Sequence, residues 1–239
     1  MSTLRYDGAG VRYGGVNALC AVSFSVEPGC VTGLIGPNGA GKTTLINATT
    51  GIVRPTSGAI YLDDRRIDGL PQHAIARAGI ARTYQNIRLF AELSVAENIE
   101  AGGYRLSVPL AERALQTLLA AAGLGHVGLD ARAGSLSYGD QRRLEIARAM
   151  AAIPPVVMLD EPAAGMNPHE TQALGDHIRG LAANGAAVLL VEHDMRLVFA
   201  ICDRVIVLNF GEVIAAGTPA EISRDPAVVE AYLGSEATA

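Results

Sequence analysis

Residues 36–43 carry the residue types and spacing that bind phosphate. They read Gly-Pro-Asn-Gly-Ala-Gly-Lys-Thr and match the G-x-x-x-x-G-K-[ST] pattern of a phosphate-binding loop, also called the Walker A motif. An apolar run precedes them and a helical pattern follows, which is the context that this loop requires. The glycines let backbone N–H groups converge on an anion, and the positive end of the helix dipole adds attraction. These residues therefore predict a site for the β- and γ-phosphates of a nucleotide.

Side chains of this loop are expected to contribute as well as its backbone. Lys42 would neutralise phosphate oxygens and Thr43 would place its hydroxyl on Mg²⁺, with Thr44 as a further phosphate contact. An ordinary glycine-rich turn is the alternative, but such a turn does not need a lysine and a threonine at this offset. The loop residues assigned to the nucleotide are Gly36, Pro37, Asn38, Gly39, Ala40, Gly41, Lys42, Thr43 and Thr44.

A second group of candidate residues follows two later apolar runs. Residues 156–159 read as a buried strand, and Asp160 and Glu161 come at its carboxyl end, where ligands lie in open α/β sheets. This pattern, the Walker B motif, predicts that Asp160 binds Mg²⁺ through water and that Glu161 orients or deprotonates the attacking water. His193 also follows a strand and can reach the γ-phosphate from the side. The alternatives are two acids that merely start a loop and a structural histidine.

The elements around these residues alternate as in an α/β protein. Two strands within residues 17–36 lead into the phosphate-binding loop, and a helix is expected from Lys42. Apolar strands are expected again at 155–161 and 186–194, with a helix between them. The tail predicts a hairpin at 209–211, followed by short helices.

Helical spacing dominates the segment from about 87 to 153. Four apolar residues at i, i+3, i+4 and i+7, counted from Leu115, lie on one face of a predicted helix that Gly123 ends. No linker or repeat divides the chain. We therefore predict one domain over the whole sequence, with a core lobe of residues 1–86 and 154–239 and a helical lobe of residues 87–153.

The composition limits the class of protein. The 239 residues carry a net charge of −5, and the clustered Lys and Arg that a nucleic-acid surface demands are missing. The apolar strings fall short of the roughly 20 residues of a membrane-spanning helix, and the first residues lack the order of a secretory signal. Cys20, Cys30 and Cys202 have no metal-ligand spacing, so we expect buried free thiols in a reducing compartment and a cytoplasmic protein.

The stretch LSYGDQRRLEIARAM, which begins at Leu136, combines a helix start with an unexplained glycine. Ser137 and Asp140 before a helix form an acceptable capping box, which accounts for these two residues but not for Gly139. At this stretch the chain resembles the ATP-binding cassette (ABC) family, whose signature is Leu-Ser-Gly-Gly-Gln. The first, second and fourth residues match, whereas Tyr138 and Asp140 depart from the signature.

The resemblance covers nearly the whole chain and implies both a fold and a set of roles. The fold is an α/β P-loop NTPase: an ABC-type nucleotide-binding domain with a RecA-like core, an antiparallel β-subdomain and a helical subdomain. By resemblance, Tyr13 stacks on adenine, and Gln85 joins the Mg²⁺ and water network and reports to a membrane partner. ATP is then held between the phosphate-binding loop of one subunit and Ser137 and Gly139 of a second. Asn167 lies in the loop that crosses to that second subunit, although a helix cap explains it equally well.

Several strings, among them ARTYQNIRLF, DEPAAGMNPHET and VVEAYLG, are most similar to ATPases of branched-chain (hydrophobic) amino acid importers. Urea importer and lipopolysaccharide export ATPases resemble them closely, and residues 99–114 are shorter than the usual stretch. The resemblance implies ATP and Mg²⁺ as ligands. It implies as partners a second ABC ATPase, transmembrane permeases and, indirectly, a substrate-binding protein. It places the chain on the cytoplasmic face of the inner membrane.

Two other functions fit a cassette of this kind. A soluble ABC-type switch that acts on nucleic acid predicts tandem cassettes, a long coiled-coil insertion or basic patches, whereas this sequence has one cassette and a net negative charge. A nucleotide-binding regulator that does not hydrolyse ATP predicts replacement of Glu161 or His193, and both residues are present.

Overall fold

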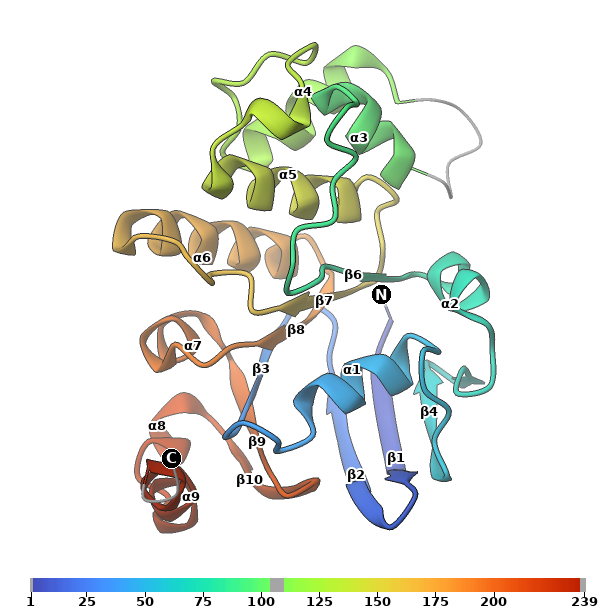
Figure 1. The fold of residues 1–239 in the computed structure, drawn as a ribbon, viewed down its shortest axis with the longest axis vertical. Helices are drawn as coiled ribbons and strands as arrows, with labels where there is room; N and C mark the ends of the chain where they lie inside the picture. The colour runs from blue at the N-terminus through green and yellow to red at the C-terminus, as the bar shows by residue number, and fades with distance from the viewer. Residues whose placement is uncertain (1, 104–109, 237–239) are drawn as a thin grey trace.

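A six-stranded sheet forms the centre of the molecule in the computed structural model, which describes residues 2–103 and 110–236 (Figure 1). Its strand order is β10-β9-β3-β8-β7-β6; the strands from β9 to β6 run parallel, and β10 is antiparallel to β9. The strands are β3 (Val31–Ile35), β6 (Ile80–Arg82), β7 (Val156–Asp160), β8 (Ala187–Val191), β9 (Arg204–Asn209) and β10 (Glu212–Gly217). Every residue of β3, β7 and β8 is buried, as expected for parallel strands covered on both faces.

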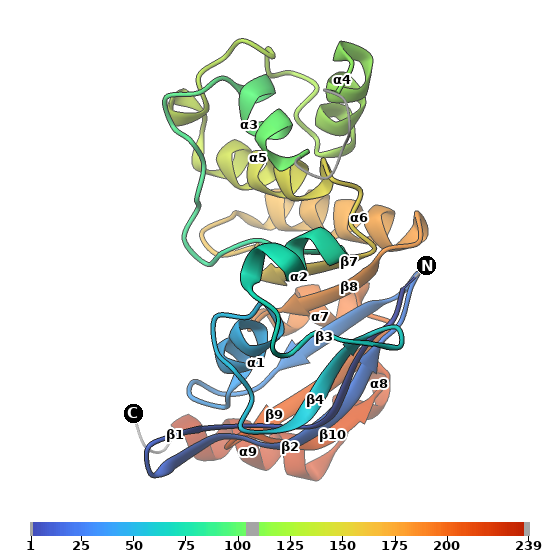
Figure 2. The ribbon, with the colours of Figure 1, turned by 90° about the vertical axis from the view of Figure 1, so that its right-hand side faces the viewer.

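A second, antiparallel sheet lies against the central sheet with helix α1 (Lys42–Thr49) between them (Figure 2). Its order is β2-β1-β4-β5, built from β1 (Leu4–Tyr13), β2 (Val16–Val26), β4 (Ser57–Leu62) and β5 (Arg65–Arg66). Leu45 and Ile46 of α1 share one apolar cluster with residues of both sheets. This packing fixes the axis of α1, and with it the loop that precedes the helix.

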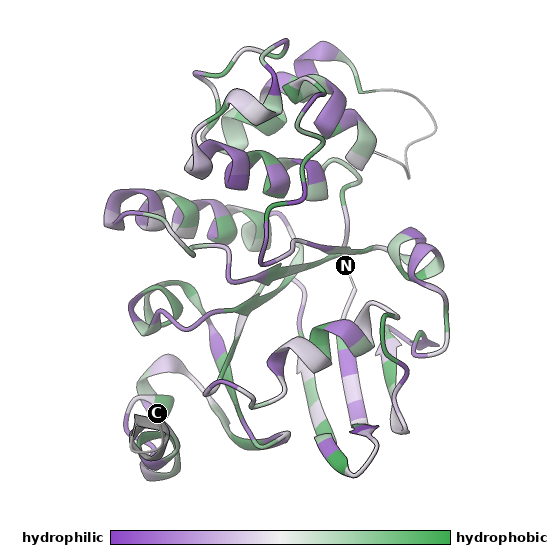
Figure 3. Ribbon diagram, viewed as in Figure 1, coloured by the Kyte–Doolittle hydropathy of each residue, from purple (hydrophilic) through white to green (hydrophobic). Residues whose placement is uncertain are grey.

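Helices cover the opposite face of the central sheet. They are α6 (Pro168–Ala183), α7 (Met195–Ile201), α8 (Pro219–Ile222) and α9 (Pro226–Glu236), while α2 (Gln72–Ala78) leads into β6. Leu174 and Ile178 of α6 pack with Leu190 of β8 in a second apolar cluster. In Figure 3 the apolar colour is concentrated on the central strands, which lie between these layers.

A group of helices above the sheets in Figure 1 has an apolar cluster of its own. It contains α3 (Val95–Gly102), α4 (Glu112–Ala121), the short 3₁₀ helix η1 (Ala133–Ser135) and α5 (Tyr138–Met150). Leu115 and Leu119 of α4 pack there with Leu144 of α5. No helix in the described ranges has the length and apolar character needed to cross a bilayer.

Most of the expected elements are present. The helix from Lys42, the strands after residues 155 and 186 and the tail hairpin are confirmed. The hairpin turn has positive φ at both Phe210 and Gly211, which suits the twist of the two strands. Gly123, also with positive φ, follows the end of α4 as expected. Of the stretch 99–114, residues 104–109 lie outside the described residues.

The sequence did not mark β1, α2 and β6. Glycines at 8 and 10 and bulges interrupt the alternation of β1, and β6 has three residues, too few to show a period. The expectation of buried cysteines was partly wrong, because Cys202 is buried whereas Cys20 and Cys30 are half-buried. All three are free thiols.

Candidate active site

Three neighbouring strands end at the same level of the central sheet, and candidate residues follow each of them. Val191 of β8 is level with Leu34 of β3 on one side and with Asp160 of β7 on the other. The phosphate-binding loop, Glu161 and His193 therefore leave the sheet side by side. This edge is the carboxyl edge, where parallel α/β sheets bind ligands.

The backbone of the phosphate-binding loop explains its first and last glycines. Gly36 has φ 149°, and a Cβ there would lie 2.1 Å from the carbonyl oxygen of Leu208. Gly41 has φ 107°, and its Cβ would lie 2.6 Å from the carbonyl oxygen of Ala18. Side chains at these positions would clash with backbone that cannot yield, so β9 and β2 hold the loop in place from two directions.

Lys42, the only lysine in the sequence, opens helix α1 and turns back over its own loop. Its ammonium group donates hydrogen bonds to the carbonyl oxygens of Gly36 and, at 3.0 Å, of Pro37. Burial lowers the pKa of Lys42, while the negative charges of Glu161 and Asp160 oppose this shift. The lysine is thus held at the loop by neutral carbonyls that the oxygens of a phosphate can replace.

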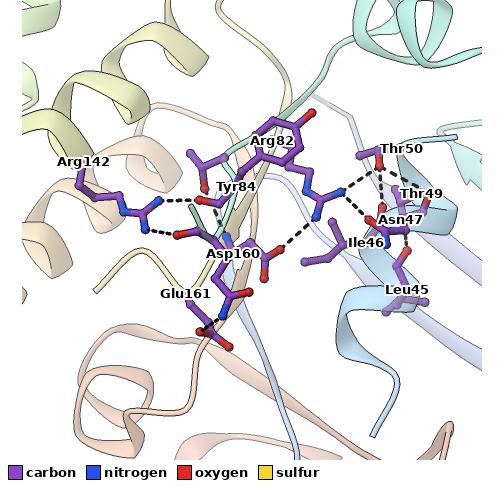
Figure 4. A network of polar contacts seen from close by, with 12 residues as sticks. Leu45, Ile46, Asn47, Thr49, Thr50, Arg82, Tyr84, Arg142, Asp160 and Glu161 are labelled. Atoms are coloured by element: carbon purple, nitrogen blue, oxygen red, sulfur yellow. Dashed lines mark hydrogen bonds and ion pairs between the residues drawn. The ribbon is translucent and has the colours of Figure 1, made fainter. Parts of the chain in front are cut away.

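Asp160, at the end of β7, is a buried carboxylate with an arginine partner that the sequence did not reveal. Arg82 at the end of β6 donates from Nη2 to Oδ2 of Asp160 at 3.1 Å (Figure 4). The other arm of Arg82 donates to Oδ1 of Asn47 on α1 at 2.7 Å. Burial raises the pKa of Asp160, and the hydrogen bond and charge of Arg82 oppose that rise. Arg82 therefore favours the ionised form that a cation needs.

Glu161 begins the next loop in a left-handed conformation, with φ 47°. Its backbone N–H donates to the carbonyl oxygen of Val191 at 2.9 Å, which fixes the turn against β8. Its carboxylate accepts a hydrogen bond from Nε2 of Gln85 at 3.0 Å (Figure 4). The structure thus brings together Glu161 and Gln85, which are 76 positions apart in the sequence.

The donors at this edge fit Mg²⁺. Arg82 contacts Oδ2 of Asp160 and leaves Oδ1 for water or a cation, and Thr43 is exposed at the start of α1. Carboxylate, hydroxyl and amide oxygens are the hard ligands that this ion prefers, with water completing the shell. Asp160, Thr43 and Gln85 are the chain's own candidates for the ion.

His193 lies two residues beyond β8 with its side chain 68% exposed, so its ring is available at the surface of this edge. The residue before it, Glu192, is buried and was not singled out in the sequence. Its carboxylate accepts from the N–H of Ala163 at 2.8 Å and from the N–H of His193 at 3.2 Å. Burial raises the pKa of Glu192, and these N–H bonds oppose the rise. Glu192 therefore ties the loop after Glu161 to the loop of His193.

Ser137 and Gly139 lie at the start of α5, in the helical region of the molecule. The Ser137 hydroxyl accepts from the N–H of Asp140 at 3.2 Å and donates to Oδ2 of Asp140 at 2.9 Å. The helix cap is therefore present. A full capping box would also need the Asp140 side chain to accept from the backbone N–H of Ser137; here it accepts from the Ser137 hydroxyl instead. Within the described ranges, no hydrogen bond or ion pair joins Ser137 or Gly139 to the phosphate-binding loop.

Tyr138, the first departure from the family signature, has a packing partner. A Cβ built on Gly165 would lie 3.1 Å from its ring, so the tyrosine covers the loop that leads into α6. Asn167 in that loop caps α6 through a full capping box with Glu170, with Pro168 as the first helical residue, which confirms the expected cap. Tyr13 is half-exposed at the end of β1, beside the turn into β2.

Comparisons with known proteins place this site in a family. The family model described as ABC transporter matches residues 19–164, and the model described as branched-chain amino acid ATP-binding cassette transporter matches residues 212–238. The chain belongs to the ABC transporter family, as one of its ATP-binding cassettes. The expected α/β fold, with a RecA-like core, an antiparallel sheet and a helical region, is confirmed.

Individual relatives show which ABC proteins this chain is similar to. The chain is 45% identical, over 97% of both sequences, to the high-affinity branched-chain amino acid transport ATP-binding protein LivG of Salmonella typhimurium. It is 42% identical, over 90% of both sequences, to the lipopolysaccharide export system ATP-binding protein LptB of Acidithiobacillus ferridurans. Among solved structures, the ADP conformation of the ABC cassette MJ1267 superposes with a TM-score of 0.87 at 33% identity, covering 98% of this chain and 99% of that one.

Proposed function

We propose that this chain hydrolyses ATP as the nucleotide-binding subunit of an importer for branched-chain amino acids. The observation that carries the proposal is the carboxyl edge of the central sheet, where Lys42, Asp160 and Glu161 lie together and Gln85 contacts Glu161. A cation to bind phosphate, a carboxylate for a metal and a second carboxylate for water are the components that phosphoryl transfer to water requires.

In this mechanism the chain acts mainly by positioning and by charge. The backbone N–H groups of the phosphate-binding loop and the ammonium group of Lys42 bind the β- and γ-phosphates. Thr43 would supply an oxygen ligand for Mg²⁺ and Asp160 would hold the ion through water; the ion would shield the charge of the triphosphate. Glu161 accepts a hydrogen bond from water in line with the γ-phosphate and takes its proton, while Gln85 orients the same carboxylate. His193 donates to the γ-phosphate from the side.

A second cassette completes the site in this proposal. The start of α5, with Ser137 and Gly139, presents a helix N-terminus that attracts a phosphate bound elsewhere. Within the described residues, Ser137 bonds to Asp140 and not to the phosphate-binding loop of its own chain. ATP therefore binds between two cassettes, the same chain or a paralogue, with Tyr13 stacked on the adenine. Loss of the γ-phosphate removes the contact that favours the closed pair.

A groove between the core and the helices is the proposed docking site for a permease. It encloses about 570 Å³, and its lining includes Arg88 and Phe90, which follow Gln85, and Arg148 of α5. Phe90 is 52% exposed, which is unusual for a large apolar side chain. A membrane subunit bound here would contact the loop of Gln85 directly. The proposal therefore includes peripheral attachment to a membrane, and the family resemblance makes the cytoplasmic face the proposed side.

The choice of importer over lipid exporter rests on the comparisons. The chain is 45% identical to LivG, against 42% and 39% for two LptB proteins. The match of residues 212–238 to a branched-chain amino acid cassette model adds the C-terminal segment. A periplasmic substrate-binding protein would then select the cargo, which this chain does not touch.

Replacement of the proposed base tests hydrolysis and pairing together. We expect Glu161→Gln to lower the hydrolysis rate by about 10³-fold, within the range for loss of a general base, and to accumulate an ATP-bound dimer. Phosphate release and light scattering after size-exclusion chromatography measure the two effects. Asp64→Asn, an exposed carboxylate in a turn, is the control. Hydrolysis at the native rate by the Glu161 variant would remove this residue from the mechanism.

Purification from membranes tests the importer. An affinity-tagged chain extracted gently from its source membranes should carry two related permeases and a second cassette, identified by mass spectrometry. Vesicles that contain this complex should take up leucine in the presence of ATP. Recovery of a lipid-export permease would leave the ATPase in place and overturn the importer.

A further inference from the structure

An ion pair is buried where helix α5 meets the loop of Gln85. Arg142 and Glu145, one turn apart on α5, have side chains that are 0% and 1% exposed, and Nη1 of Arg142 lies 2.9 Å from Oε2 of Glu145. A buried pair of this kind adds little stability compared with well-packed apolar residues. Its presence therefore calls for another explanation.

The pair also binds the backbone of the loop that carries Gln85. Nη1 of Arg142 donates to the carbonyl oxygen of Tyr84 and Nη2 to that of Gln85, each at 2.6 Å (Figure 4). Oε1 of Glu145 accepts from the N–H of Arg88 at 3.1 Å. Three backbone groups of residues 84–88 are thus held by two side chains of a single helix.

These contacts hold the backbone of the loop. Residues 84–88 have no regular secondary structure, so their backbone groups need partners outside a helix or sheet. The planar guanidinium of Arg142 holds two consecutive carbonyls in a fixed orientation, which a single-point donor cannot do. The side chain of Gln85 reaches Glu161 from this fixed backbone.

The same helix starts at the residues proposed to meet the second nucleotide. α5 runs without a break from Tyr138 to Met150, and Ser137 caps it. A displacement of the Gln85 backbone must therefore either move this helix or break the buried contacts of Arg142. Breaking them would leave Arg142 paired only with Glu145 and would take the guanidinium donors away from the carbonyl groups of Tyr84 and Gln85, which costs free energy.

We propose that Arg142 is a positioning residue that makes the loop of Gln85 and helix α5 move as one unit. On this basis a change at Gln85, caused by the γ-phosphate of one site, reaches Ser137 and Gly139 at the other site of the pair. Arg142 is then the mechanical link through which the two nucleotide sites cooperate. The inference rests on the proposed pairing of two cassettes and adds the residue that couples their sites.

The test removes both buried charges while it keeps the volume of the core. The double variant Arg142→Met, Glu145→Leu leaves no unpaired charge, so it should fold. Its matched control is Arg132→Met, Glu92→Leu, which removes an exposed ion pair of the same group of helices. Thermal unfolding establishes that each variant is folded. Arg142→Lys, which keeps the charge but not the planar fork, is the second variant.

Three quantities are measured on the native chain and on each variant. They are the affinity for ATP at limiting protein concentration, the extent of ATP-dependent dimerisation, and the Hill coefficient of ATP hydrolysis. In the double variant we expect unchanged ATP affinity, dimerisation weakened by about tenfold, and a Hill coefficient that falls from near 2 to about 1. Arg142→Lys should likewise weaken dimerisation and lower the Hill coefficient. The control should match the native chain in all three.

The outcomes separate this inference from the proposed function. A folded double variant with native dimerisation and a native Hill coefficient would overturn the role of Arg142 and leave the paired ATPase intact. A native chain that shows neither ATP-dependent dimerisation nor cooperativity would overturn the pairing itself, and the coupling with it. A loss of thermal stability without loss of cooperativity would show that the pair is structural only, which also contradicts the inference.

Discussion

The carboxyl edge of the central sheet and the start of α5 are both proposed to meet nucleotide, but they are built differently. At the sheet edge, strand register sets the positions: Asp160 is level with Val191, which is level with Leu34. At the start of α5, side-chain contacts set the position of the helix, because the buried pair of Arg142 and Glu145 connects it to the Gln85 loop.

This difference separates what is fixed from what can move. Rows of backbone hydrogen bonds between fully buried strands have no alternative partners, so the sheet edge behaves as a rigid platform. The helices have no backbone ladder of this kind to the sheet, so α5 and the Gln85 loop, joined by Arg142 and Glu145, can shift together as one unit. We therefore expect binding of ATP to depend on the sheet edge and pairing of cassettes to depend on the helices.

The largest effect is expected at the buried ion pair of Arg82 and Asp160 at the sheet edge. Arg82→Met leaves buried Asp160 without its partner and should lower the free energy of unfolding by about 3 kcal/mol. The pKa of Asp160 should rise further, because the hydrogen bond and the charge of Arg82 no longer oppose the effect of burial. Urea unfolding measures the loss. Arg5→Met, which removes an exposed pair with Asp7, should change stability by less than about 1 kcal/mol. Equal losses in the two variants would contradict the special role of Arg82.

The second-largest effect is expected when the lysine of the phosphate-binding loop, Lys42, is removed. Lys42→Ala should weaken ATP binding by about 100-fold, because charge-assisted bonds to phosphate contribute about 3 kcal/mol. Titration with a fluorescent ATP analogue measures the change, with Arg65→Ala on exposed β5 as the control. The single lysine allows a second check. An amine reagent should modify Lys42 and the chain terminus, and ATP should protect Lys42 alone; equal labelling with and without ATP would contradict the contact.

The smallest effect separates the two explanations of Ser137. Ser137→Ala and Ser94→Ala each remove the cap of a helix, of α5 and of α3, and should each lower stability by about 1 kcal/mol. If Ser137 also meets nucleotide on a second cassette, its variant alone should weaken ATP-dependent dimerisation, by about tenfold. Thermal unfolding and light scattering measure the two quantities. Identical dimerisation in both variants would leave Ser137 as a helix cap only.

The sequence predicted the sheet edge well because its signals are local. The phosphate-binding loop occupies eight consecutive residues, and the acids directly follow a buried run, so spacing alone points to them. It did not reveal Arg82, Glu192 or the Arg142–Glu145 pair. Each of these makes a contact with a residue 29 to 78 positions away. A charged residue in a helix or beside a strand is ordinarily a surface residue, and nothing in the spacing shows that these are buried.

The sequence by itself determined the α/β alternation, the phosphate-binding loop and the strand-end carboxylates, because period and turn chemistry act over a few neighbouring residues. Only the tertiary structure decided that Gln85 reaches Glu161, that Arg82 pairs with Asp160 and that α5 holds the Gln85 loop. Those contacts join residues that are distant in the chain. They arise because burial leaves polar groups that must find partners wherever packing brings them together.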